Sequence, residues 1–479
     1  MRPRHLSGSE PARGARDSQR PASGLLILLA TVTVAALTLP DLPPDVCFDD
    51  PGDLQAAACH LGIAHPPGYA AYCAAGWAWT RIAPVSPPRA ITLACWATAL
   101  AALLLAGVLM QVVGVPPVIA ASFVLLLAAH PNVHENLLLP EVYAPTAALL
   151  LLAVLCLHHY ARHGRFAAVA VGALAIGLAA GSRTPALLMV CGLLPALWLA
   201  ARRRAPRLRP APTLAGAAAL AALPMLASVA YLWARDAPQS AYNHHALLTE
   251  PQMRVPYEPA DVRRRLVRSL TGVDVLTRAD GTAAPGLSER TWWLARRVMP
   301  SGPLALAGVA LLVLAGALRM GRAAPHTLLA LSGVMAGCLA LMWLIPMDGT
   351  AGDCMPALLA GGVLAARAVS PGSAAPGSLI GSQVVVLAAV VLLTAPVIAN
   401  KPAAVSQADA APFLRELDMA TLPPDSVIVC TWFESTALRH ARIATGRRDV
   451  EIVAVRPESM PPLLGRLLRE QPQRPLPRW

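Results

Sequence analysis

The sequence has few charged residues for its length. Asp, Glu, Lys and Arg make up 14% of its 479 residues, whereas soluble domains carry about 25%. Hydrophobic residues make up 56%, and the mean hydropathy is +0.53. Such a chain cannot cover a globule with a solvated surface, and its composition also excludes a disordered protein, a coiled coil and a disulfide scaffold. We therefore expect a polytopic membrane protein with some water-facing parts.

Lysine and paired cysteines are also scarce. Lys401 is the single lysine, so the formal net charge of +12 comes from arginine. The arginines lie between apolar runs, where they orient a chain in a membrane, and we expect no nucleic-acid partner. The nine cysteines form no C-x-x-C pair, which argues against a zinc site or redox motif. The sequence leaves open whether Cys47, Cys59 or Cys73 form a disulfide.

Long uncharged runs locate the membrane spans, because a helix needs about 20 apolar residues to cross a bilayer. The run 21–40 follows five arginines and has no small-residue cleavage site, which favours an uncleaved first helix over a signal peptide. The run 90–134 is too long for one span, and Gly-Val-Pro-Pro at 114–117 divides it. About eleven helices are expected in all, the others near 141–158, 166–181, 185–201, 213–234, 303–319, 326–346, 354–369 and 379–398. The run 354–369 is the weakest of them because it is short and contains Arg367.

The arginines also predict the orientation of these helices. With residues 1–20 as a basic cytoplasmic tail, fifteen arginines fall in inside segments. Only Arg81, Arg89 and Arg183 fall in the outside segments 41–89, 130–140, 182–184 and 347–353, and the arginine-rich segment 235–300 is too long to count. The membrane domain then covers 21–400, and the C-terminus is extracytoplasmic. The arginine bias, with abundant Ala, Gly and Pro, suggests a GC-rich genome, and we expect a bacterial cytoplasmic (inner) membrane.

Three longer segments are expected outside: 41–89, 235–300 and 401–479. In the last, apolar runs at 427–430 and 450–455 predict two strands, and 434–444 and 460–470 predict helices. The fold class is therefore an all-α polytopic membrane protein with a small α/β C-terminal extracytoplasmic lobe. In 235–300, the run Arg263, Arg264, Arg265 with Arg268 either attracts anionic lipid or forms the solvated face of a helix, which is the commoner case.

The first outer segment holds the clearest candidate for chemistry. Asp49, Asp50 and Asp53 lie just after the first span, where carboxylates are costly unless they have partners or a task. Pro51-Gly52 predicts a tight turn, so that Asp50 or Asp53 would by spacing alone most often cap the following helix. The stretch His-Pro-Pro-Gly-Tyr at 65–69 predicts a rigid turn with an interfacial Tyr69.

Together these pieces resemble the protein O-mannosyltransferase-like family of GT-C glycosyltransferases, long catalogued as a domain of unknown function. The family combines an Asp-Ser-Gly-Glu-type stretch with Leu-Gly-(Val/Ile)-Ala-His-Pro-Pro-Gly-Tyr. Here Asp-Pro-Gly-Asp stands at 50–53 and Leu-Gly-Ile-Ala-His-Pro-Pro-Gly-Tyr at 61–69. Glu-Val-Tyr at 141–143, Leu-Pro-Pro-Asp-Ser-Val-Ile-Val at 422–429 and Gly-Arg-Arg-Asp-Val at 446–450 extend the likeness along most of the chain. The chain departs from the pattern in three places: Pro51 and Asp53 replace the Ser and Glu, although Asp53 keeps the charge; Arg183 replaces a usual His; and 432–436 replaces an Asp-Asn-Asp-Thr stretch.

The resemblance implies a GT-C-like fold and transfer of a hexose, with mannose the first to consider, from a polyprenyl-phosphate sugar. The acceptor would be an exported protein or an envelope glycan, the protein would sit among membrane lipid, and no cofactor would be needed. Because phosphate is a good leaving group, one general base suffices, and the product is inverted. We expect Asp50 to be this base, with Asp53 as second choice.

Five further residues are expected to bind substrate. Arg183, alone in a short outside turn, is the candidate for the donor phosphate, unless it is an interfacial anchor that snorkels. His65 would donate to the phosphate or orient Asp50, or be structural. Glu141 would orient an acceptor or cap its helix. The family motifs add Tyr69 and Tyr143.

Other functions were weighed. His130, His134 and Glu135 have the spacing of metal ligands on a helix, but no third ligand is obvious, and we expect no metal. A flippase for the same lipid-linked sugar would show charges at mid-membrane and two similar halves, and the sequence has no repeat. A catalytically silent relative that acts as an assembly partner stays open because of the departures at Arg183 and 432–436.

Overall fold

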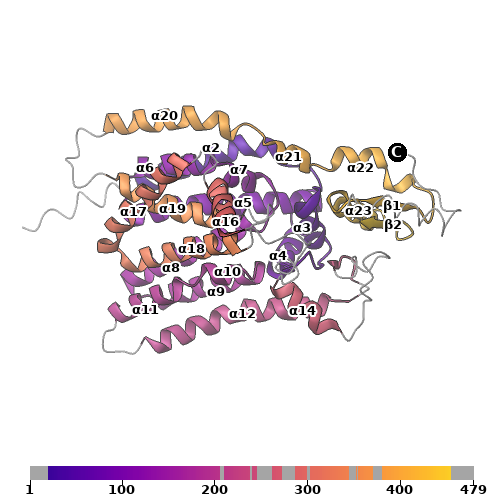
Figure 1. Cartoon of the computed structure of the whole chain (residues 1–479), viewed down its shortest axis with the longest axis horizontal. Coiled ribbons are helices and arrows are strands. Elements are labelled where there is room, and N and C mark those ends of the chain that lie inside the picture. The colour runs from indigo at the N-terminus through magenta and orange to yellow at the C-terminus, as the bar shows by residue number, and fades with distance from the viewer. Residues whose placement is uncertain are drawn as a thin grey trace, which may run out of the picture.

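Long apolar helices make up most of the structure, a computed structural model that describes residues 20–204, 210–237, 240–244, 261–271, 286–298, 303–344, 352, 354–370 and 380–454. The bundle is built from helices most of which run roughly parallel to one long axis (Figure 1). They are α2 (Arg20–Thr38), α5 (Pro87–Val112), α6 (Pro117–Ala128), α7 (Pro131–Leu138), α8 (Tyr143–His163), α9 (Phe166–Ser182), α10 (Ala186–Met189), α11 (Leu193–Arg204), α12 (Ala211–Arg235), α17 (Pro303–Ala323), α18 (Pro325–Leu344), α19 (Cys354–Val369) and α20 (Ile380–Ile398).

Every span expected from the sequence coincides with one of these helices or with a helix pair. Among the described residues, eight stretches are long and apolar enough to cross a membrane, α6 and α7 form a further pair bent by 75°, and α9 and α19 are shorter apolar helices. The break expected at 114–117 is confirmed, since α5 ends at Val112 and α6 begins at Pro117. Proline suits a first helical position because its missing N–H would have no partner there.

The short helix α19 lies inside the bundle. Between Cys354 and Ala366 all its residues but Leu358 are buried, and it packs against α17, α18, α5 and α8. On α17, Gly316 lies so close to the α19 backbone that a Cβ would come within 1.8 Å of the Leu364 oxygen. Small residues permit such close helix packing. This helix is therefore central to the fold although its sequence signal is weak.

The two ends of the bundle differ in composition. At one end lie the helix connections that carry the arginines: Arg204 donates to Ala161 O at 2.8 Å, Arg319 donates to Ser370 O at 2.8 Å, and Arg367 reaches Gly114 O at 3.5 Å. At the opposite end lie α3 (Asp49–Cys59), α4 (Ala70–Thr80), α14 (Val262–Thr271) and the C-terminal segments (Figure 1). The segments expected inside and outside the membrane are thus separated in space.

The C-terminal lobe has the expected pattern. Strands β1 (Val427–Cys430) and β2 (Glu451–Ala454) pair in parallel, with Val427 opposite Glu451, and α23 (Trp432–Ala444) connects them. Thr431 and Glu434 form a capping box at the start of α23. The helix predicted at 460–470 lies outside the described residues. The remaining elements among the described residues are η1 (Leu39–Asp41), α16 (Leu287–Val298), α21 (Ala403–Ala408), α22 (Ala411–Leu417) and η4 (Met419–Thr421).

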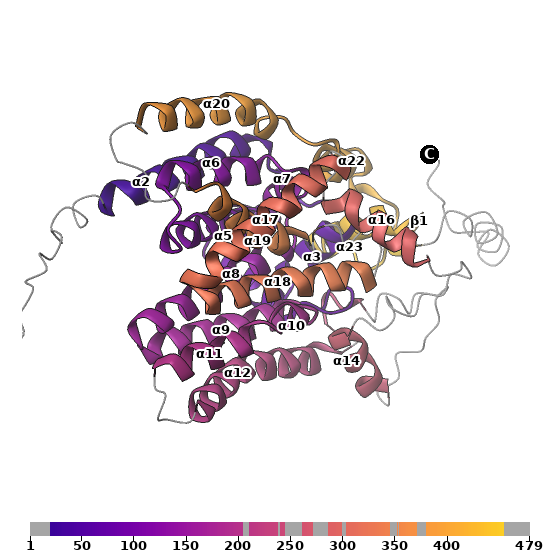
Figure 2. The same ribbon diagram turned by 60° about the vertical axis from the view of Figure 1, so that its left-hand side comes forward.

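The lobe packs directly on the first outer segment. Helix α23 lies against α3, and Phe48 stacks on Phe433 with ring centroids 4.8 Å apart. A Cβ at Gly52 would meet Cys47 O at 2.0 Å and Thr436 Oγ1 at 2.8 Å, so this approach requires a glycine. Figure 2 shows α23 beside α3 from a second direction. None of the nine cysteines, all of which lie among the described residues, forms a disulfide.

Candidate active site

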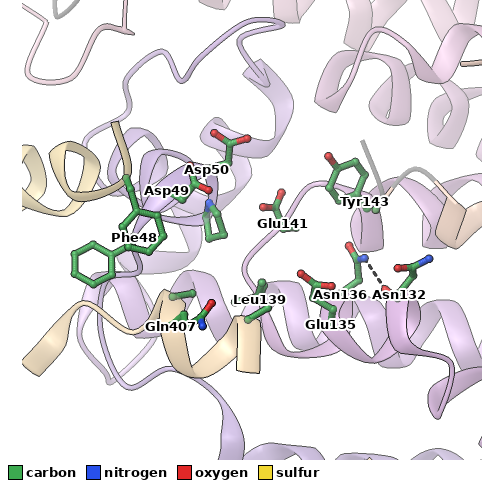
Figure 3. A pocket seen from close by; sticks show the side chains of 15 residues that line it. Phe48, Asp49, Asp50, Asn132, Glu135, Asn136, Leu139, Glu141, Tyr143 and Gln407 are labelled. Atoms are coloured by element: carbon green, nitrogen blue, oxygen red, sulfur yellow. Dashed lines mark hydrogen bonds between the residues drawn. The ribbon is translucent and has the colours of Figure 1, made fainter. Parts of the chain in front are cut away.

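A pocket of about 330 Å³ opens at the end of the bundle opposite the arginines. The start of α3, helix α7, the segment before α8, helix α21 and the start of α23 surround it (Figure 3). Its described lining residues are Phe48, Asp49, Asp50, Pro51, Asn132, Glu135, Asn136, Leu139, Glu141, Tyr143, Gly352, Ala404, Gln407, Ala408 and Phe433. Three of the expected site residues, Asp50, Glu141 and Tyr143, therefore meet in one cavity.

Asp49 and Asp50 form the first turn of α3, where the helix dipole favours negative charge. The residue at the N-cap is Phe48, and no side chain caps the helix. The expected capping by Asp50 or Asp53 is wrong, and so is the expected turn at Pro51-Gly52, because both residues lie inside the helix. Proline is tolerated there since the first-turn N–H groups have no partner within the helix. Asp50 is left half-exposed at the pocket, its side chain 41% accessible.

Asp53 lies one turn further along α3 and does not line the pocket. Its side chain is fully buried, accepts a 2.7 Å hydrogen bond from the backbone N–H of His65, lies 2.8 Å from His65 Nδ1, and accepts a hydrogen bond from the Tyr242 hydroxyl. Burial alone would raise the pKa of Asp53, but the hydrogen bond and charge of His65 and the Tyr242 hydroxyl lower this pKa to about 2. Asp53 thus anchors the turn at 65–69 as a buried carboxylate.

His65 connects this buried carboxylate to Asp50. Its Nε2 lies 3.9 Å from Asp50 Oδ2 and 3.2 Å from the Tyr69 hydroxyl. Burial disfavours the imidazolium, but the charges of Asp50 and Asp53 outweigh it and raise the pKa of His65 to about 9. A protonated ring donates from both nitrogens, so His65 satisfies Asp53 on one side and faces Asp50 on the other. The backbone of Tyr69 has a left-handed conformation, with φ 46°.

The lobe supplies a second partner for Asp50. The indole Nε1 of Trp432 donates to Asp50 Oδ1 at 3.3 Å. Trp432 opens α23 in the stretch that departs from the family pattern, more than 380 residues along the chain from Asp50. Nothing local in the sequence predicts this contact, because it exists only once the lobe packs on α3.

Glu141, Tyr143 and Arg183 form the opposite side of the site. Burial and the nearby Asp50 raise the pKa of Glu141 to about 8. The guanidinium of Arg183 lies 4.7 Å from the centre of the Tyr143 ring, and only 7% of Arg183 is exposed. Arg183 ends α9 in the short turn before α10, as expected, but its burial is incompatible with the alternative of an anchor that snorkels to the interface.

Helix α7 contributes three polar residues that sequence reasoning did not select. Asn132, Glu135 and Asn136 are spaced i, i+3 and i+4, which places them on one face, and all three line the pocket. The same stretch was considered for metal binding. His130 Nε2 instead lies 3.1 Å from Val298 O, and within the part of the chain that the structure describes no three His, Cys, Asp or Glu side chains gather as metal ligands would.

The second outer segment also reaches the site. Tyr242, fully buried, hydrogen-bonds Asp53, and Ile63 N donates to Tyr242 O at 3.0 Å. In the arginine run of α14, Arg265 is buried and its Nε lies 2.9 Å from Asp236 Oδ2. Both alternatives weighed for the run are therefore wrong for Arg265, which is a structural partner. Arg263 and Arg264 remain exposed.

Fold and site together define a polytopic helical membrane protein that holds an acidic pocket beyond one end of its bundle. Among solved structures, the chain is similar to the crystal structure of the Archaeoglobus fulgidus oligosaccharyltransferase in the apo form, with a TM-score of 0.52 and 10% sequence identity. The match covers 90% of this chain and 64% of that protein, so this chain spans less than two thirds of its length. No family model and no curated protein sequence matches the chain. The likeness confirms the GT-C-like fold expected from the sequence.

Proposed function

We propose that this chain is a membrane glycosyltransferase that moves a hexose from a polyprenyl-phosphate sugar to an acceptor outside the membrane. The observation that carries the proposal is the setting of Asp50. Its half-exposed carboxylate opens into the pocket and is held by Trp432 on one oxygen and faced by His65 on the other. The GT-C-like fold supports the same conclusion, since the structural neighbour is an oligosaccharyltransferase.

In the proposed reaction Asp50 is the general base. The acceptor hydroxyl attacks the anomeric carbon, its proton passes to the Asp50 carboxylate, and the bond from that carbon to the phosphate oxygen breaks with both electrons leaving on the phosphate. A single displacement inverts the anomeric centre. General-base assistance of this kind contributes about 10²–10⁴-fold. Asp53 and His65 act as positioning residues, because they contact the base or its neighbour rather than the pocket.

The donor phosphate is assigned to the Arg183 side of the site. Arginine binds phosphate bidentately, and Arg183 lies behind the Tyr143 ring that lines the pocket. We place the site on the extracytoplasmic face of a bacterial inner membrane. The arginine count supports this orientation, because the arginine-rich connections occupy the end of the bundle opposite the pocket.

The test is donor turnover by the wild type and by Asp50→Asn in nanodiscs. A panel of polyprenyl-phosphate sugars, with mannose first, is supplied together with envelope extract as acceptor, and free polyprenyl phosphate is measured. We expect release by the wild type, a loss of at least 100-fold in kcat for Asp50→Asn, and unchanged donor binding. Equal release by both proteins would move the base elsewhere. If folded protein bound donor but released nothing, a flippase or a silent assembly partner would be the better account.

A further inference from the structure

The pocket is lined by many oxygen acceptors, most of them on carboxyl groups. Asp49, Asp50, Glu135 and Glu141 all line it, and its described lining includes no Lys, Arg or His. Figure 3 shows Glu141 between the two aspartates of α3 and the polar face of α7. Carboxylates that share a small cavity repel one another, and water screens them less there than at an open surface. A cationic group would be favoured at this wall of the pocket and would in turn favour the ionised form of Glu141, whereas the donor phosphate is assigned to the Arg183 side of the site.

Asn136 provides an independent sign that a ligand belongs here. Its side chain is only 5% exposed and lines the pocket. The amide nitrogen donates to Asn132 O at 2.7 Å, so the orientation of the amide is set, and the buried Oδ1 atom accepts no hydrogen bond from any residue that the structure describes. A buried acceptor without a donor is costly. We therefore expect a bound molecule to donate an N–H or O–H hydrogen bond to this oxygen.

We propose that the pocket binds a carbohydrate that bears a protonated amine, with the ammonium group beside Glu141 and donating to Asn136. An ammonium group has three donors and no acceptor, which matches a lining of carboxylate and amide oxygens. Its hydrogen bonds to carboxylates are charge-assisted and stronger than those of a neutral hydroxyl. The inference rests on the proposed function and deepens it, because it names the substrate class: an amino sugar, present either in the donor or in the acceptor.

Binding of simple glycosides tests the inference without turnover. The full chain in nanodiscs is titrated with methyl glucosaminide, methyl glucoside and methyl N-acetylglucosaminide, which differ in the charge at one position. We expect the wild type to bind the glucosaminide at least tenfold more tightly than either neutral glycoside. Glu141→Gln and Asn136→Leu should each reduce this preference to threefold or less. The control is Glu416→Gln, which removes an exposed carboxylate on α22 outside the pocket and should keep the preference.

Assays of sugar transfer show whether the amine belongs to the donor or to the acceptor. One arm compares polyprenyl-phosphate glucosamine with polyprenyl-phosphate glucose as donors, and the other compares octyl glucosaminide with octyl glucoside as acceptors. Faster turnover in either arm supports the inference and assigns the amine to that substrate. Equal dissociation constants for charged and neutral glycosides, or a preference that Glu141→Gln leaves intact, would overturn it.

The outcomes also keep this inference apart from the proposed function. Turnover of neutral sugars without any amine preference in binding would leave the glycosyltransferase standing and reject the amine site. An amine preference in folded protein that never releases polyprenyl phosphate would support the binding site and reject the enzyme.

Discussion

Removing one N–H group from the C-terminal lobe should slow the reaction without unfolding the protein. The substitution is Trp432→Phe, which keeps an aromatic ring at the start of α23 and deletes the Nε1 donor to Asp50 Oδ1. Asp50 then loses one of its two described side-chain contacts and keeps His65. If the indole holds the carboxylate toward the pocket, the base should spend less time in its productive orientation, and kcat should fall.

The size of the effect follows from the geometry of this hydrogen bond. A hydrogen bond to a charged group contributes about 1.5–3 kcal/mol. At 3.3 Å this one is longer than usual for N–H to oxygen, and the Asp50 side chain is 41% exposed, so water competes for it. We therefore expect about 1–1.5 kcal/mol, which corresponds to a fall in kcat of about 5- to 13-fold.

The assay is release of polyprenyl phosphate at saturating and at limiting donor. For Trp432→Phe we expect a lower kcat, a KM within about twofold of the wild type, and a melting temperature within about 2 °C. Trp79→Phe is the matched control, because Trp79 is 43% exposed on α4 and does not line the pocket. A wild-type kcat for Trp432→Phe would refute the positioning role of the indole, and an equal loss in Trp79→Phe would show that the effect is not specific to the site.

Three further predictions concern other parts of the site and the topology. The pKa of His65 is raised to about 9, so the stability that His65 contributes is complete below pH 6.5 and is lost as the pH rises through 9. The melting temperature of the wild type should therefore fall by roughly a few degrees between these pH values. A fall of the same size in the Asp53→Asn variant would contradict the pairing of His65 with Asp53. Arg183→Lys keeps the charge but loses the planar group over Tyr143, and KM for the donor should rise roughly tenfold with kcat little changed; an unchanged KM would remove Arg183 from the phosphate site. In a cysteine-free background, the Glu416→Cys variant should react with an impermeant maleimide added outside cells and the Arg322→Cys variant should not, and the reverse result would invert the topology.

The helical fold was predictable because apolar length and arginine placement are local properties of the chain. The runs at 90–134 and 427–454 gave the α5–α6 break and the strand–helix–strand order of the lobe as the structure has them. The start of α3 was not predictable in this way. Pro51-Gly52 is typical of a turn, yet the chain stays helical there because proline tolerates the first turn and Gly52 lets α23 approach.

The candidate site was predictable only in part. The spacing of Asp50, Glu141 and Tyr143 along the chain says nothing of their meeting in one pocket, although each was selected for its own chemistry. The i, i+4 spacing of Asn132 and Asn136, with Glu135 between them, indicates a polar helix face, although the neighbouring His130 and His134 point to metal binding instead. Trp432 and Tyr242 had no local signal at all.

Local properties of the chain specify an apolar helical bundle with arginines at one end and a small α/β lobe after the last span. They do so because hydrophobic burial and backbone hydrogen bonding in lipid leave few alternatives to a helix of that length. The different settings of Asp50 and Asp53, which lie one turn apart on α3, arise only from the tertiary structure. Asp53 is buried by His65 and Tyr242, whereas Asp50 faces the pocket under Trp432, because residues from distant segments pack around one helix.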